Sequence, residues 1–461
     1  MENSVQIPRL VIAGTGSGVG KTTTMVGLAQ ALQSQGLRVA TFKCGPDYLD
    51  PTYHKRATQR PCHNLDGWMM GRDSVLTTFE RGVVDCDIAL IEGVMGLFDG
   101  VSPVSDVGST AEIAKWLSAP VVLLIDASGM ARTIAAIAMG FKMFDPELNL
   151  AGILCNRVGS RGHLDLLDKS MRDLPSILGG WPVQETLTLP ERHLGLVTAS
   201  YNEVSDTVLT AWGKLANEWL NLSEILRIAK SAPSLPAPTE EVRNYSPGKL
   251  CRIGIAFDEA FHFYYEDNLR RLESEGAELV RFSPIHDAEL PKVDGLYLGG
   301  GYPEVYAEAL STNTRMLQQI RSFHGPLYAE CGGLMYLCEE IKTLEGKSWT
   351  MASLLPGTAV MRDRLQALGY VEVETQEASI IGEAGLRFRG HQFRYSDLER
   401  VPDSFSRLYS MRRRRGGENQ REGYAKNNIL ASYIHAHWAS NPLVAKGFVA
   451  SCIKQKEVEG Q

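Results

Sequence analysis

Residues 10–24 read LVIAGTGSGVGKTTT, and this stretch decides the fold of the first half of the chain. A short apolar run, predicted to be a strand, leads into a glycine-rich turn, and Lys21-Thr22 open a predicted helix. Bare backbone N–H groups in such a turn, together with the N-terminus of the helix, can surround phosphate oxygens. The order of strand, glycine loop and helix therefore predicts a nucleotide-binding phosphate loop.

Seven residues of this loop are predicted to hold the nucleotide: Gly16, Gly18, Val19, Gly20, Lys21, Thr22 and Thr23. Lys21 would reach the terminal phosphates of ATP, and the Thr22 hydroxyl would take one coordination position of Mg²⁺. The standard spacing G-x-x-x-x-G-K-[ST] would place a glycine at Thr15, whereas the first glycine here is Gly14. That departure matches a variant loop in which one residue is inserted.

Acidic residues follow further predicted strands of the same half. Asp47 follows the apolar run 39–42, Glu92 ends the run 88–91, and Asp99 follows in EGVMGLFDG. Ligands of a doubly wound sheet bind beyond the carboxyl ends of its strands, and Mg²⁺ prefers oxygen ligands. Glu92 is the first candidate for a metal ligand because it stands directly at a strand end. Asn156, after a fifth apolar run, is predicted to contact either the nucleotide base or a carboxylate substrate.

The chain is predicted to consist of two α/β domains, at 1–230 and 249–461. The segment Ser231–Gly248 between them holds four prolines, small residues and charges, which predicts a linker. Apolar strand-like runs alternate with helical stretches on both sides of it, a pattern typical of parallel sheets covered by helices. The predicted strands lie at 10–13, 39–42, 88–91, 121–125 and 153–155 before the linker, and at 253–257, 278–282, 295–298 and 326–329 after it.

A nucleophile is predicted in the second half, where residues 326–337 read PLYAECGGLMYL. An apolar strand leads to Cys331, two glycines follow, and a helical pattern begins. This is the arrangement of a nucleophile elbow, which exposes its side chain at a sharp turn between strand and helix. We expect the helix N-terminus to lower the pKa of the Cys331 thiol and so to favour the thiolate.

A thiolate nucleophile needs a base, and the segment SYIHAHWAS offers His435 and His437 on the same side of an extended chain. We predict His435 to be the general base. The glycines of YLGGGYPE follow another predicted strand. The N–H groups of Gly300 and Gly301, together with that of Gly332, are predicted to form an oxyanion hole for acyl transfer.

The composition excludes several classes of protein. The 461 residues carry a net charge of −7, which argues against a dedicated nucleic-acid binder. No apolar run reaches the roughly 18 residues that span a bilayer, and the first residues lack the basic region of a signal peptide. The eight cysteines include no C-x-x-C pair, so they are predicted to be reduced thiols rather than a disulfide frame or a zinc site. We therefore expect a cytoplasmic protein that binds no nucleic acid and no membrane.

Ten segments follow one another along the chain: GTGSGVGKTT, KCGPDYLDP, NLDGWM, IEGVMGLFDG, PERHLGL, AFHFYYEDNL, LGGGYPE, ECGGLMYL, GHQFRYS and SYIHAHW. In this order, from about Pro8 to Val449, they resemble the family of cobyrinic acid a,c-diamide synthases, which are cobalamin-type glutamine amidotransferases. The resemblance implies a first half like dethiobiotin synthetase, with a P-loop NTPase-like parallel sheet. It implies a second half like the class I glutaminases, with a flavodoxin-like α/β fold.

The resemblance also implies an activity. The a and c acetate side chains of a corrin polycarboxylate would be amidated in turn, with Mg²⁺, ATP and L-glutamine. Asp47, Glu92 and Asp99 would handle metal, phosphate and intermediate, with Asp47 and Asp99 catalytic and with Thr22, Glu92 and Asp47 as the metal ligands. Cys331 would be the glutaminase nucleophile and His435 its activator.

Some points stay open at the level of the sequence. Many class I glutaminases carry a Glu two residues after the His, where this chain has His437, so the residue that orients His435 is undefined. His391 also matches the family, without an assigned role. Other tetrapyrroles, such as nickel sirohydrochlorin or hydrogenobyrinic acid, would be amidated by the same residues. A more distant alternative is a regulatory ATPase with a deviant phosphate loop. The resemblance leaves a homodimer open.

Overall fold

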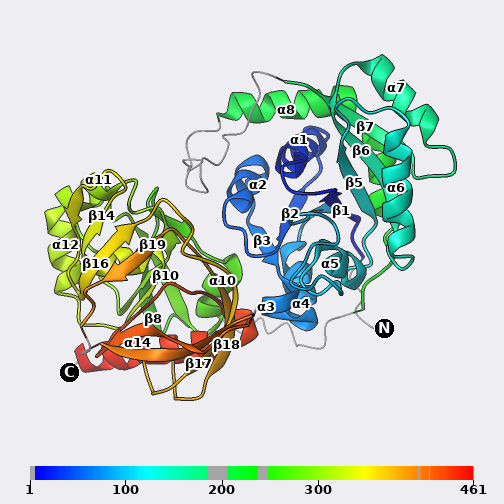
Figure 1. The fold of residues 1–461 in the computed structure, drawn as a ribbon. Coiled ribbons are helices and arrows are strands. Elements are labelled where there is room, and N and C mark those ends of the chain that lie inside the picture. Colours follow the sequence, from blue (N-terminus) through cyan, green and yellow to red (C-terminus); the bar gives the residue numbers. More distant parts are fainter. Residues whose placement is uncertain (1–5, 185–204, 237–247, 403–404, 415, 460–461) are drawn as a thin grey trace. The chain divides into compact units, whose positions relative to one another are not determined.

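The structure, a computed structural model, describes residues 6–184, 205–236, 248–402, 405–414 and 416–459. The chain forms two compact units, Met1–Val242 (the first unit) and Arg243–Gln461 (the second unit), each of which is α/β (Figure 1). No helix in the described part of the chain is both long and apolar enough to cross a membrane.

The first unit is built on a seven-stranded parallel sheet in the order β3-β2-β4-β1-β5-β6-β7. Its strands are β1 (Arg9–Gly14), β2 (Val39–Cys44), β3 (Cys62–Leu65), β4 (Ile88–Glu92), β5 (Val121–Asp126), β6 (Leu150–Val158) and β7 (Ile177–Pro182). The central strands β1, β2 and β4 are buried along their whole length, as expected of a sheet covered on both faces. Of the strands in this sheet, only the two edge strands, β3 and β7, were not predicted from the sequence.

Helices lie on both sides of this sheet, with α1 on one side and α6 on the other (Figure 1). The helices are α1 (Lys21–Ser34), α2 (Asp50–Thr58), α3 (Gly67–Met70), α4 (Arg72–Gly82), α5 (Thr110–Trp116), α6 (Thr133–Phe144), α7 (Arg161–Ser170), α8 (Asp206–Trp219) and α9 (Leu222–Lys230). Apolar residues of β1, α1 and α8 share one core, in which the rings of Trp181 and Trp212 meet edge to face at 5.5 Å. The core fixes α1, and therefore the loop before it, against the sheet.

The segment predicted as a linker begins packed against the first unit. Ala232 and Leu235 are buried, and the guanidinium of the buried Arg9 donates to the carbonyl of Pro233. Residues 237–247 of that segment lie outside the described residues, and so does the motif PERHLGL at 190–196.

The second unit is built on a ten-stranded mixed sheet in the order β10-β8-β11-β13-β22-β21-β20-β17-β18-β23. The first five strands of this order are mutually parallel and the others pair antiparallel. The strands are β8 (Cys251–Ala256), β10 (Ala277–Phe282), β11 (Gly295–Leu298), β13 (Leu327–Glu330), β17 (Ala367–Thr375), β18 (Arg387–Arg394), β20 (Ser406–Arg413), β21 (Gln420–Lys426), β22 (Ile429–Ser432) and β23 (His435–His437).

Smaller elements complete the second unit. One short sheet pairs β9 (Phe261–Phe263) with β12 (Gly300–Gly301). A second short sheet contains β14 (Cys338–Lys342), β15 (Ser348–Thr350), β16 (Leu355–Met361) and β19 (Ser396–Glu399). The helices are α10 (Glu266–Ser274), α11 (Ala307–Thr312), α12 (Thr314–Arg321), α13 (Gly332–Leu337) and α14 (Leu443–Glu459). The predicted α/β fold of both halves is confirmed. The antiparallel half of the large sheet was not foreseen.

Candidate functional site

The phosphate loop of the first unit connects β1 to α1, where its glycines are needed for space and conformation. Gly20 has a φ of 98°, in the left-handed region that side chains disfavour. A Cβ at Gly20 would lie 2.4 Å from Nδ2 of Asn156. Asn156 Nδ2 in turn donates to the carbonyl of Val19 at 2.8 Å. The predicted residue Asn156, at the end of β6, therefore supports the loop itself.

Lys21, the first residue of α1, closes over this loop. Its ammonium donates to the carbonyl of Gly16 at 2.8 Å and to that of Met95 at 2.7 Å. Burial, and next the charge of Lys43, lower the pKa of Lys21 to about 8. The side chain thus joins the loop to the segment that follows β4 and carries a proton that is held less tightly than usual.

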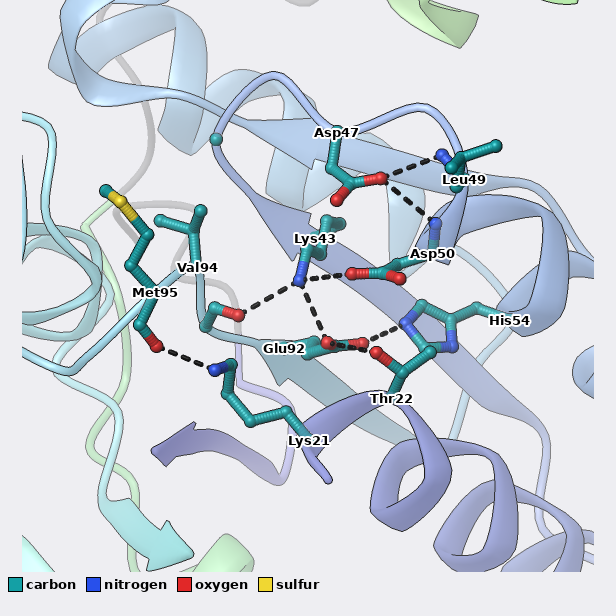
Figure 2. A network of polar contacts seen from close by, with 12 residues as sticks. Lys21, Thr22, Lys43, Asp47, Leu49, Asp50, His54, Glu92, Val94 and Met95 are labelled. Carbon is teal, nitrogen blue, oxygen red and sulfur yellow. Dashed lines mark hydrogen bonds and ion pairs between the residues drawn. The ribbon is translucent and has the colours of Figure 1, made fainter. Parts of the chain in front are cut away.

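Glu92, at the carboxyl end of β4, is the centre of a buried polar network (Figure 2). Oε1 of Glu92 accepts from Nζ of Lys43 at 2.8 Å and from Oγ1 of Thr22 at 2.9 Å. Oε2 lies 2.5 Å from Nε2 of His54. Burial alone would raise the pKa of Glu92, but the Lys43 charge and the His54 hydrogen bond outweigh it and lower the pKa to about 2. Glu92 is therefore a carboxylate at neutral pH.

Sequence reasoning missed three members of this network: Lys43, Asp50 and His54. Lys43 Nζ also lies 2.8 Å from Oδ2 of Asp50. Burial opposes the charge of Lys43, yet Asp50 and Glu92 hold its pKa above the ordinary value. A signal existed, because a lysine in an otherwise apolar buried strand needs an acidic partner, and Asp50 and His54 stand four residues apart on one helix face.

The other two predicted acids engage the backbone of their own loops. Oδ1 of Asp47 accepts from the N–H groups of Leu49 and Asp50, at 2.8 and 3.1 Å, and so shapes the start of α2 (Figure 2). Asp99 accepts from the N–H of Gly96 at 2.9 Å. Of the predicted residues, Glu92 and Thr22 thus lie within hydrogen-bonding distance of each other. Within the described ranges no three His, Cys, Asp or Glu side chains converge as a metal site.

Cys331 of the second unit stands in a strained turn between β13 and α13. Its φ of 46° and ψ of −102° are unusual for any residue with a side chain, and its N–H donates to the carbonyl of Ser432 at 2.7 Å. The sharp turn between strand and helix is as predicted, but the Cys331 side chain is buried rather than exposed, because the second unit packs around it. The expected pKa is wrong, because burial, and next the Glu304 charge, raise the pKa of the Cys331 thiol to about 12. The helix that follows spans only Gly332–Leu337.

The three glycines predicted for the oxyanion hole lie beside Cys331 and His435. A Cβ at Gly332 would lie 3.0 Å from the backbone nitrogen of Gly301. A Cβ at Gly300 would lie 2.4 Å from Cε1 of His435. Glycine is therefore required at 300 and 332 so that the loop, the elbow and the histidine can approach one another.

His435 begins β23, and its ring is buried. Burial lowers the pKa of His435 to about 3, so the imidazole is neutral at physiological pH. Its ring stacks on that of His391 with centroids 5.0 Å apart and planes 18° apart. The ring of His437 instead lies 4.5 Å from that of Tyr265. Burial lowers the pKa of His437 to about 4, against the charge of Asp267.

Glu330, directly before the cysteine, was also missed by sequence reasoning. Its carboxyl accepts from the hydroxyl of Tyr328 at 2.9 Å, from the N–H of Ala436 at 3.0 Å and from the hydroxyl of Tyr297 at 3.0 Å. Burial raises the pKa of Glu330 to about 7. Asn268 holds the same segment from the other side by donating to the carbonyl of Ala436 at 2.8 Å. The backbone between the two histidines is therefore fixed.

Comparison with known proteins assigns a domain family to each half. Residues 10–195 match the CobQ/CobB/MinD/ParA nucleotide binding domain. Residues 252–443 match the CobB/CobQ-like glutamine amidotransferase domain. The predicted division into a nucleotide-binding half and an amidotransferase half therefore agrees with both matches.

Relatives align along almost the whole chain. The cobyrinate a,c-diamide synthase of Leptospira interrogans (strain Fiocruz L1-130) is 56% identical over 98% of this chain and 100% of its own length. That of Syntrophotalea carbinolica is 46% identical over 96% of this chain and 98% of its own. That of Methanobrevibacter smithii is 40% identical over 94% of this chain and 96% of its own.

Proposed function

Because the chain belongs to the cobyrinate a,c-diamide synthase family, we propose that it uses ATP and glutamine to amidate the a and c acetate side chains of cobyrinic acid. The observation that carries the proposal is the alignment of both halves with such synthases, together with a phosphate loop in one unit and a Cys–His site in the other. The first unit would activate the carboxylate and the second would release ammonia.

The chemistry of the first unit follows from the poor leaving group of a free carboxylate. A substrate carboxylate oxygen attacks the γ-phosphorus of ATP, so that ADP leaves and an acyl phosphate forms. Ammonia then attacks the acyl carbon, and phosphate leaves. Lys21 is proposed to stabilise charge that develops on the transferred phosphoryl group. Asp47 and Asp99 are proposed to handle the intermediate.

Thr22 and Glu92 offer the donor set that Mg²⁺ prefers. Both are oxygen ligands, and their side-chain oxygens lie 2.9 Å apart beside the phosphate loop. Mg²⁺ is usually bound by one or two carboxylates together with substrate phosphates, and would neutralise phosphate charge. Thr22 and Glu92 would therefore hold the ion, with Asp47 as the third proposed ligand.

This metal assignment predicts the behaviour of two matched variants of Thr22. Thr22→Ala should raise the Mg²⁺ concentration needed for half-maximal synthesis by about tenfold, because a hydroxyl ligand is lost, whereas Thr22→Ser should titrate like the wild type. Glu92→Gln should stop turnover or raise the requirement further. Normal Mg²⁺ titrations of Thr22→Ala and of folded Glu92→Gln would contradict the assignment.

The second unit would hydrolyse glutamine through a thioester. The Cys331 thiol passes its proton to His435 as the sulfur attacks the amide carbon of glutamine. Ammonia leaves with that proton, and water then releases glutamate. Backbone N–H groups of Gly300, Gly301 and Gly332 would bind the oxyanion. Burial raises the thiol pKa and lowers the imidazole pKa, so the resting pair is neutral and charge would develop only during attack.

The product identifies the acceptor. The test incubates purified protein, Mg²⁺-ATP and amide-¹⁵N-glutamine separately with cobyrinic acid, hydrogenobyrinic acid and nickel sirohydrochlorin. Mass spectrometry of each product then shows how many labelled nitrogens it contains. We expect two labelled nitrogens in cobyrinic acid. If only another macrocycle is labelled, the proposed amidation chemistry would stand, but that macrocycle would be the acceptor in place of cobyrinic acid. ATP hydrolysis with neither label nor glutamate formation would contradict the proposal and favour a regulatory ATPase.

A further inference from the structure

Three buried aromatic side chains of the second unit stand in a row that ends at His435. His391 and His435 are directly opposite each other in the antiparallel pair of β18 and β23. Their rings stack at 5.0 Å with an angle of 18° between the planes. On the other side, the hydroxyl of Tyr265 lies 3.0 Å from Nδ1 of His391. The row joins the start of α10 to the base through two direct contacts.

The row is rigid because each member is held by a different element. Tyr265 is the residue directly before α10 and is 1% exposed, and His391 is 6% exposed on a strand that is paired on both edges. The carbonyl of Ala436, next to His435, accepts from Asn268 of the same helix. The base and its stacking partner therefore share one fixed frame.

We infer that His391, held by Tyr265, is the positioning residue that orients the general base His435. The inference rests on the proposed glutaminase reaction of Cys331 and His435. The stack fixes the plane of the His435 ring. It also presents an aromatic face to that ring at the moment when the ring takes the thiol proton and becomes a cation.

Tyr265 has a separate part in this arrangement. A tyrosine hydroxyl that donates to Nδ1 of His391 leaves the ring proton on Nε2 and keeps the ring neutral. A neutral ring can stack on a forming imidazolium, whereas a charged one would repel it. His437, two residues after the base, packs its ring against that of Tyr265 and so helps to hold Tyr265 in place.

The test compares variants of the row in the full-length enzyme. His391→Ala should lower kcat for glutamine hydrolysis by about 10- to 100-fold, because a misplaced base loses part of its contribution to the rate. The KM for glutamine should stay within twofold of the wild type. The rate of alkylation of Cys331 by iodoacetamide should fall in parallel. His391→Phe, which keeps a stacking ring, should recover most of the loss. Tyr265→Phe should give a smaller loss than His391→Ala.

Two controls separate positioning from folding. Tyr336→Phe removes another buried hydroxyl, one with no hydrogen-bond partner among the described residues, and should leave kcat unchanged. Synthesis from free ammonia should be normal in every variant, because it bypasses glutamine hydrolysis. If the row only positions His435, the kcat of Tyr336→Phe and the rate of ammonia-dependent synthesis in all variants should therefore equal those of the wild type.

Specific results would overturn the inference. An unchanged kcat in His391→Ala would do so, and equal losses in His391→Ala and His391→Phe with lowered melting temperatures would assign His391 to folding instead. An unchanged alkylation rate in His391→Ala would also count against it. Failure of the proposed function would look different, because the wild-type enzyme itself would then hydrolyse no glutamine.

Discussion

Replacing Cys331 by alanine is expected to abolish glutamine-dependent amidation and to leave ammonia-dependent amidation intact. Without a thiol there is no nucleophile for the glutamine amide, and loss of a nucleophile typically costs several orders of magnitude, so the glutamine-supported rate should fall by at least about 1,000-fold. The phosphate loop lies in another compact unit, which the substitution does not touch. Synthesis would be followed with glutamine and then with ammonium chloride at saturating Mg²⁺-ATP.

Cys338 provides a matched control for this experiment. It is fully buried close to Cys331 in sequence, at the other end of α13, and its thiol donates to the carbonyl of Leu334. Cys338→Ala should keep both activities. A folded Cys331→Ala protein that ammonia does not rescue would contradict the division of labour between the units, and one that still uses glutamine would remove Cys331 from the reaction.

The phosphate loop could be predicted because all its determinants are contiguous in the sequence. Gly20 and Lys21 stand next to each other, and the strand and helix around them are short local patterns. The network around Glu92 is different, because Lys43 and His54 are 49 and 38 residues away from it in the chain. Only the parallel pairing of β2 with β4 brings Lys43 opposite Glu92. A single sequence does not encode that pairing in any local pattern.

At the proposed glutaminase site, the electrostatics were equally hard to predict from the sequence. The strained turn at Cys331 follows from its small neighbours and was predicted. The pKa of the thiol was predicted in the wrong direction, because a helix N-terminus is a local feature whereas burial depends on tertiary packing. The pairing of His391 with His435 depends in turn on the antiparallel half of the sheet, for which the sequence offered no assignment.

Replacing Lys21 by alanine is expected to stop synthesis with either nitrogen source. The ammonium would no longer stabilise the transferred phosphoryl group, and loss of one such charged donor costs about 100- to 1,000-fold in kcat. The variant also loses hydrogen bonds to the carbonyls of Gly16 and Met95, worth about 1 kcal/mol each, so the melting temperature should be measured alongside. Hydrolysis of glutamine without ATP should stay within twofold of the wild type.

Lys142→Ala is the matched control, because Lys142 is an exposed lysine of the same unit whose ammonium donates to the carbonyl of Asp173. It should leave synthesis unchanged. Unchanged turnover in Lys21→Ala would remove the phosphate-loop assignment. The decisive comparison is between Lys21→Ala, which ammonia should not rescue, and Cys331→Ala, which ammonia should rescue. If both variants respond to ammonia in the same way, carboxylate activation and ammonia release do not reside in separate units.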